Sequence, residues 1–244
     1  MSYLRIICFV FVAILLSSCS SESQDKDTII VATSADNPPY EYIKDGKIIG
    51  LDIDIIEAIA KEMGKKIIIK NLDFPGLLPA LSSNSLDLVI AGITATEERK
   101  RRVDFSLGYL NTVMAVLFKK SEKISSIKDF TGKVIGVQMG TTWESYAKEL
   151  ANNIPGIKIR SLANNLVLIE ELKSGAIDLI IMEELQVNKF KVNVPDMESF
   201  VLDDTRGEFA IALPKDSSLT ESINLVIKKM LDSGTIAQIK SKWL

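Results

Sequence analysis

Hydrophobic and polar positions along the chain follow two alternating spacings. Residues 28–33 (TIIVAT) are almost continuously apolar and β-branched, which is typical of a strand buried on both faces. In residues 52–63 the apolar side chains fall on one face of a helix, and Gly64 supplies its end. The same two patterns predict strands at 65–71, 86–90, 112–118, 133–138, 157–161, 177–182 and 198–202, and helices at 75–83, 142–150 and 164–173. Strands that alternate with helices indicate an α/β protein with mainly parallel sheets.

This order of strands and helices begins anew after about residue 118. The chain has 244 residues, which suffice for two modest domains. An apolar segment at 208–213 then leads back to two helices predicted within 220–244. We therefore expect a first lobe of residues 28–117 and 210–244, interrupted by a second lobe of residues 118–209, with a two-strand hinge between them.

Residues 1–18 have the pattern of an export signal. They contain one charge, Arg5, followed by an apolar run that is short for a membrane-spanning helix. The run ends in Leu-Ser-Ser-Cys, which resembles a bacterial lipobox. We therefore expect a lipoprotein signal peptide at 1–18, a lipid on Cys19, a flexible tether at 19–27, and a location in the periplasm or at the cell surface, lipid-anchored to a membrane. The alternative is an ordinary secretory leader, with Cys19 incidental.

Composition narrows the possible chemistry. The sequence has no histidine, which excludes histidine-based metal sites and Ser-His or Cys-His catalysis. The formal net charge is −3, and this mild acidity argues against a nucleic-acid partner. The two cysteines are Cys8, inside the predicted leader, and Cys19, so we expect no disulfide in the exported part.

The polar stretch after the strand predicted at 86–90 is the strongest candidate for a binding site. Gly92 follows the strand, and Thr94, Thr96 and Arg99 come after it. Gly92 can leave backbone N–H groups open to a small anion, and the planar Arg99 side chain can hold a carboxylate through two hydrogen bonds. From the spacing alone, an equally good interpretation is that Thr96 caps a helix and Arg99 is a solvated surface charge.

Six motifs, in order, resemble one family from about residue 28 to the C-terminus. They are VATSADNPPYEY (31–42), IIGLDIDIIEAIAKEMG (48–64), LDFPGLLPALSSNSLDLVIAGITATEER (72–99), VDFSLGY (103–109), GKVIGVQMGTT (132–142) and SGTIAQIKSKWL (233–244). At these spacings the chain resembles the polar amino-acid solute-binding proteins of ABC importers, the group that binds glutamine, histidine, or lysine, arginine and ornithine. The resemblance implies a two-lobe, type II periplasmic binding protein-like fold that closes on a ligand between the lobes.

The resemblance also implies roles for individual residues. Arg99 and Thr94 correspond to the part of the site that holds the ligand α-carboxylate, and Glu183 to the carboxylate that pairs with the α-ammonium group. Phe74 takes the position of an aromatic cleft wall. The ligand-binding residues expected in this way are Ser34, Asn37, Phe74, Ala91, Gly92, Thr94, Arg99, Gln138, Gly140, Thr141, Thr142 and Glu183.

Plainer interpretations stay open at several of these positions. Thr141 and Thr142 precede a predicted helix and could simply cap it. Glu184 could point inward in place of Glu183, or both could be surface acids. Phe74 could be a core residue.

Two positions depart from the family pattern. Asn37 stands where the family usually carries an aromatic residue, and Ser34 stands where several members carry an aspartate that contacts the distal group of the ligand. Asp36 could substitute for that aspartate. The departures leave open whether the ligand is arginine, lysine, glutamine, histidine or a smaller polar amino acid.

The resemblance predicts a binding protein that performs no chemistry. We expect the chain to capture a polar amino acid outside the cytoplasmic membrane and to deliver it to an ABC permease, with no cofactor and no metal. The alternative is a periplasmic enzyme on the same fold, such as a cyclohexadienyl dehydratase-like lyase, since a fold alone does not fix function. An enzyme would need a general acid that is not paired with a ligand ammonium group.

Overall fold

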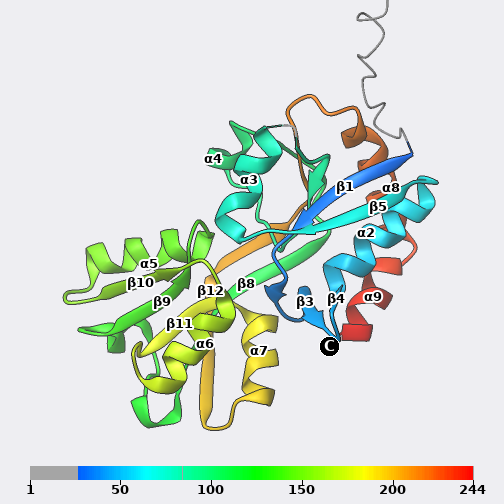
Figure 1. Cartoon of the computed structure of the whole chain (residues 1–244). Coiled ribbons are helices and arrows are strands. Elements are labelled where there is room, and N and C mark those ends of the chain that lie inside the picture. The colour runs from blue at the N-terminus through cyan, green and yellow to red at the C-terminus, as the bar shows by residue number, and fades with distance from the viewer. Residues whose placement is uncertain (1–26, 84, 244) are drawn as a thin grey trace, which may run out of the picture.

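Two lobes joined by two long strands make up this computed structural model, which describes residues 27–83 and 85–243 (Figure 1). The predicted leader and Cys19 lie outside the described residues. Among the residues that are described, no helix combines the length and the apolar character needed to cross a membrane.

The first lobe is built on a five-stranded mixed sheet. Its strand order is β5 (Lys66–Asn71), β1 (Thr28–Thr33), β6 (Leu88–Val89), β13 (Ala212–Leu213) and β7 (Asp104–Phe105). β1 pairs in parallel with β5 and β6, and β13 runs antiparallel to β6 and β7. Because β5, β1 and β6 run parallel, their carboxyl ends lie at the same edge of the sheet. The candidate binding stretch with Gly92, Thr94 and Arg99 begins at this edge.

Helices cover both faces of the first sheet. Ile29 and Val31 of β1 pack in one core with α2 (Leu51–Glu62), α8 (Leu219–Asp232) and α9 (Thr235–Trp243). Ala32 and the partly buried Ile30 pack in another core with α3 (Phe74–Ser82). Burial on both faces explains why residues 28–33 are apolar throughout.

The second lobe repeats this plan. Its strand order is β10 (Lys158–Leu162), β9 (Val134–Gln138), β11 (Leu179–Glu183), β8 (Leu110–Lys119) and β12 (Met197–Phe209). β9 is parallel to β10 and β11, whereas β8 is antiparallel to β11 and β12. The helices of this lobe are α5 (Thr142–Asn153), α6 (Asn165–Ser174) and α7 (Glu184–Asn193), with short 3-10 helices η1 (Lys120–Glu122) and η2 (Ile127–Phe130).

Two features of this lobe differ from the sequence prediction. α7 was not predicted, because its buried positions, Gln186, Val187 and Phe190, form only a weak apolar face. The separate strand predicted at 198–202 is part of the much longer β12, whose register shifts between Leu202 and Gly207.

β8 and β12 carry the chain between the lobes (Figure 1). At one end of the pair, Leu110 and Phe209 pack in the core of the first lobe. Further along, Ala115 and Leu202 pack in the core of the second lobe. Residues 115–117, which the sequence prediction assigned to the first lobe, thus pair and pack with the second. We propose that the crossing lies inside these two strands, earlier in β8 than the boundary expected at 117/118.

A small third sheet and a short helix complete the cleft-facing side of the first lobe. The sheet consists of β2 (Asp36–Asn37), β3 (Glu41–Lys44) and β4 (Lys47–Ile49), and the helix is α4 (Glu97–Lys100). β2 follows β1 directly, so its two buried polar residues lie where the lobes meet.

Candidate functional site

A small cavity lies between the lobes, and its lining contains most of the residues expected from the sequence. Its volume is about 10 Å³, so the lobes are nearly in contact around it. It is lined by Asn37, Phe74, Ala91, Gly92, Thr94, Arg99, Gln138, Thr141, Thr142 and Trp143. Nine of the twelve expected residues are in this set, whereas Ser34, Gly140 and Glu183 are not. We call this space the site cavity.

Arg99 links the two lobes across the site cavity. Thr96 caps α4 by accepting from the Arg99 backbone N–H at 3.3 Å. The guanidinium donates from Nη1 to the Thr94 carbonyl at 2.8 Å and from Nη2 to the Gly140 carbonyl of the other lobe at 2.9 Å. Its Cζ lies 5.8 Å from the centre of the Phe74 ring. Burial lowers the pKa of Arg99 to about 10, so the group is still cationic at pH 7.

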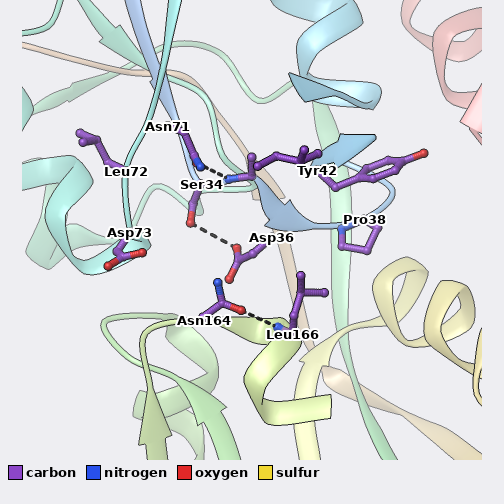
Figure 2. Close-up of a pocket in the computed structure, with 11 residues that line it drawn as sticks. Ser34, Asp36, Pro38, Tyr42, Asn71, Leu72, Asp73, Asn164 and Leu166 are labelled. Carbon is purple, nitrogen blue, oxygen red and sulfur yellow. Dashed lines mark hydrogen bonds between the residues drawn. The ribbon is translucent and has the colours of Figure 1, made fainter. Parts of the chain in front are cut away.

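Asp36 makes a second contact between the lobes. Its carboxylate accepts from the Asn165 backbone N–H at 2.6 Å and from Gln138 Nε2 at 3.3 Å, both in the second lobe. The Ser34 hydroxyl donates to it from the first lobe at 3.2 Å (Figure 2). Burial raises the pKa of Asp36, while these neutral donors lower it.

A wider cavity adjoins Asp36 and is drawn in Figure 2. Its volume is about 260 Å³. It is lined by Ser34, Ala35, Asp36, Pro38, Tyr42, Ile43, Asn71, Leu72, Asp73, Asn164 and Leu166. This lining contains two carboxylates and neither lysine nor arginine, so the space suits a cationic group.

The start of α5 contributes backbone groups to the site cavity. Thr141 is the N-cap, since its hydroxyl accepts from the Glu144 N–H at 3.2 Å and donates to the Gln138 carbonyl at 2.6 Å. The Gly140 N–H donates to the Glu144 side chain at 2.8 Å. The capping interpretation therefore holds for Thr141, and the groups suited to an anion are the N–H groups of Thr142 and Trp143 in the first helical turn.

Glu183 is buried at the end of β11, but it does not line the site cavity. One carboxylate oxygen caps α7 by accepting from the Leu185 N–H at 2.7 Å and the Gln186 N–H at 3.2 Å. Burial raises the pKa of Glu183 to about 7, against the lowering effects of the Tyr40 hydroxyl and the two N–H groups. Glu183 rather than the half-buried Glu184 is the inward-facing acid.

Gly92 lines the site cavity in a different way from that expected. Its φ is 55°, a conformation that favours glycine. Its N–H donates to Asp52 Oδ2 at 2.8 Å. This N–H is therefore not open to a ligand anion, which differs from the prediction made from the sequence. The Asn37 side chain beside it donates to Glu41 Oε1 at 2.8 Å.

Neither Asn165 nor Trp143 is predicted as a site residue from the sequence, and Asp36 is predicted only as a substitute for the aspartate that several family members carry where Ser34 stands. The sequence around Asn164 could have indicated the contact made by Asn165. An Asn directly before a helical pattern predicts an N-cap, and the first N–H groups of such a helix are open to an acceptor. The Asn164 side chain does cap α6, and the next N–H, that of Asn165, donates to Asp36.

Two α/β lobes, a pair of connecting strands and a polar cavity between the lobes define the class of the two-lobed, type II periplasmic binding proteins. The family model described as bacterial extracellular solute-binding proteins, family 3, matches residues 29–244. The chain belongs to this family.

Named relatives agree with this assignment. The chain is 37% identical to the "Arginine-binding extracellular protein ArtP" of Bacillus subtilis (strain 168), covering 97% of this chain and 94% of the relative. A solved "substrate binding protein of an amino acid ABC transporter" is 38% identical, with a TM-score of 0.83 and coverage of 89% of this chain and 99% of that one. A solved "ancestral arginine-binding protein bound to arginine" is 36% identical, with a TM-score of 0.84 and coverage of 90% and 99%.

Proposed function

We propose that this chain is the extracytoplasmic substrate-binding component of an amino-acid ABC importer, and that it holds an amino acid with a cationic side chain between its lobes. The observation that carries the proposal is a pair of charged side chains, the half-buried Arg99 and the buried Asp36, whose hydrogen-bond partners among the described residues are all neutral. The Arg99 guanidinium donates to two carbonyl oxygens. Within the described part of the chain, the Asp36 carboxylate accepts only from a hydroxyl and from amide groups.

Neutral partners offset the burial of a full charge only in part. A free amino acid carries both a carboxylate and an ammonium group, and would supply the missing opposite charges when the lobes close. The two Nη groups of Arg99 present the planar fork that binds a carboxylate through two hydrogen bonds. Glu183, held nearly half-protonated at pH 7, would ionise fully next to an ammonium group.

The cavity beside Asp36 favours a ligand with a cationic distal group. Asp36 and Asp73 are the charged groups in its lining. A guanidinium or an ammonium group there would gain opposite charges, whereas the glutamine amide would gain only hydrogen bonds. L-Arginine is therefore the first ligand to test, and the name of the Bacillus subtilis relative supports the same choice.

We infer further that the chain delivers its ligand to an ABC permease in the cytoplasmic membrane and does not convert it. The two carboxyl groups placed against the ligand, Asp36 and Glu183, would each pair with one of its cationic groups, and neither would then be free to serve as a general acid. The proposed lipid on Cys19 would keep the protein close to the permease. Replacing Cys19 with Ser should release the protein from the membrane fraction; retention of the variant would contradict the anchor.

A thermal-shift screen of the purified chain against the twenty amino acids tests the proposed function. A ligand that binds only the folded state stabilises it by about 2.7 kcal/mol at a hundredfold excess over Kd. We expect large shifts for L-arginine and L-lysine and smaller ones for L-glutamine. No shift with any amino acid would contradict the proposal.

A further inference from the structure

Two carboxyl groups lie behind the residues that line the site cavity. Glu41 of β3 and Asp52 of α2 are both 0% exposed. Glu41 Oε1 accepts from the Asn37 side chain at 2.8 Å, and Asp52 Oδ2 accepts from the Gly92 N–H and the Tyr109 hydroxyl, each at 2.8 Å. The other two oxygens, Glu41 Oε2 and Asp52 Oδ1, are buried and receive no donor from the part of the chain that the structure describes.

The local fold forces these side chains together. The first turn of α2 packs against the residues that precede β3. The Leu51 N–H donates to the Pro39 carbonyl at 3.0 Å, and the Asp52 N–H donates to the Tyr40 carbonyl at 2.9 Å. Gly50 permits this approach, because a Cβ there would lie 2.0 Å from the Tyr40 carbonyl oxygen. Asp52 therefore lies close to Glu41, near enough for each carboxyl group to act on the pKa of the other.

None of the described residues that act on this pair is a cation that could separate two negative charges. The charged groups that act on Glu41 are Asp52 from α2 and Asp36 from β2, both anionic. Tyr109 and Tyr40 face the pair as neutral phenols, and burial together with nearby carboxylates raises the pKa of each well above its usual value. Burial and the charge of Asp52 raise the pKa of Glu41 well above its usual value, and burial raises that of Asp52 to about 6.

We propose that Glu41 and Asp52 share one proton, and that this acid pair positions Asn37 and Gly92 in the lining of the site cavity. The proton bridges the two oxygens that otherwise have no donor. Glu41 then remains neutral and holds Asn37, while Asp52 carries the single negative charge and holds Gly92. Both of these residues line the site cavity. The positioning role rests on the proposed function, whereas the shared proton does not depend on any ligand.

Infrared spectroscopy tests the shared proton directly. At pH 8 the full chain should show the C=O stretching band of a buried carboxylic acid, and the band should vanish in Glu41→Gln. Glu57→Gln is the matched control, since Glu57 is exposed on the same helix α2, and it should leave the band unchanged. Absence of the band in the natural chain, or its survival in Glu41→Gln, would overturn the proposal.

The unfolding equilibrium provides a second test that needs no ligand. A carboxyl group whose pKa is raised by folding stabilises the protein below its unfolded pKa, and this stability is lost as the pH rises through the folded pKa. Relative to Glu41→Gln, the natural chain should therefore become less stable from pH 5 upward, by up to about tenfold in the unfolding constant per pH unit. A constant difference between the two chains would overturn the shared proton.

Titration with L-arginine by calorimetry tests the positioning role. Glu41→Ala removes the acceptor of Asn37 and should weaken binding tenfold or more. Glu41→Gln keeps both an acceptor for Asn37 and a donor for Asp52, and should restore the affinity to within about threefold of the natural chain. Equal losses in both variants would overturn the role. If the natural chain does not bind L-arginine or any other amino acid, the proposed function fails, while the infrared and unfolding results still decide the shared proton.

Discussion

At the scale of the residue, the site depends on a few charges that are held away from water. Arg99 is half-buried and stays protonated, and its side-chain hydrogen bonds to the described residues go to carbonyl oxygens. Such a group is costly until an anion arrives, so it should contribute strongly to ligand affinity. A solvated arginine on the same segment should contribute little.

Replacing Arg99 with Ala should weaken L-arginine binding by roughly 3–5 kcal/mol, which is more than a hundredfold in Kd, because the ligand carboxylate would then be buried without its partner. Isothermal titration calorimetry measures the change. Arg101→Ala is the matched control, because Arg101 is exposed at the end of the same short helix. Normal affinity in the Arg99 variant would place the carboxylate elsewhere.

Ligand binding should also depend on pH through Glu183. The pKa of this group, about 7, is raised by burial, so its stabilising effect on the ligand-free fold is present in acid and is lost as the pH rises through 7. An ammonium ligand requires the ionised form. Affinity should therefore fall by up to about tenfold per pH unit below pH 7.

Calorimetry in buffers of different ionisation enthalpy counts the protons released when the ligand binds at pH 6. We expect release of nearly one proton, because a group with a pKa of about 7 is mostly protonated at pH 6, and no release in Glu183→Gln. If the natural chain and the Glu183 variant release the same number, Glu183 does not contact the ammonium group.

At the scale of the element, helix starts and strand ends converge on the cleft. β2 brings Asp36 to the start of α6, and α4 brings Arg99 to the residue that precedes the α5 cap. The two contacts hold the lobes closed around the site cavity. Each contact is made by one side chain and joins segments that lie far apart in the chain. Replacing that side chain can therefore alter the cleft without disturbing either helix.

Asp36→Asn keeps the shape of the side chain and removes its charge. We expect the affinity for L-arginine to fall tenfold or more and that for L-glutamine to fall less than threefold, because only the first ligand carries a distal cation. Asp45→Asn serves as the control, since Asp45 is exposed and does not line this cavity. Parallel losses for the two ligands would show that Asp36 acts only between the lobes.

The periodic elements were predictable because each one is set by its own sequence. Burial on both faces made β1 recognisable, and the apolar stripe identified α2. α7 lacks such a stripe and was missed. The contact from Asp36 to Asn165 was not predictable from spacing, since 129 positions separate the two residues and only the closed fold joins them.

The candidate site shows the same division between local and distant causes. The Thr96 cap and the position of Arg99 follow from a few neighbouring residues, and the structure has both. The fate of the Gly92 N–H depends on Asp52, which lies 40 positions earlier in the chain. Local sequence shows that a glycine can expose its N–H, but only the packing of α2 shows which group takes it.

At the scale of the whole molecule, two lobes with separate cores are joined by β8 and β12 (Figure 1). A pair of strands can bend with little cost to either core, so ligand affinity can be converted into closure. The sequence contains no histidine. Among the described residues, the carboxyl groups whose pKa values are raised closest to neutral pH are Asp52, at about 6, and Glu183, at about 7.

A crystal structure of the chain grown with L-arginine tests the central claim most directly. We expect the ligand between the lobes, with its carboxylate in bidentate contact with Arg99, its ammonium group facing Glu183 and its guanidinium beside Asp36. An arginine bound outside the cleft, or bound in the cleft with its carboxylate away from Arg99, would contradict this account of the site.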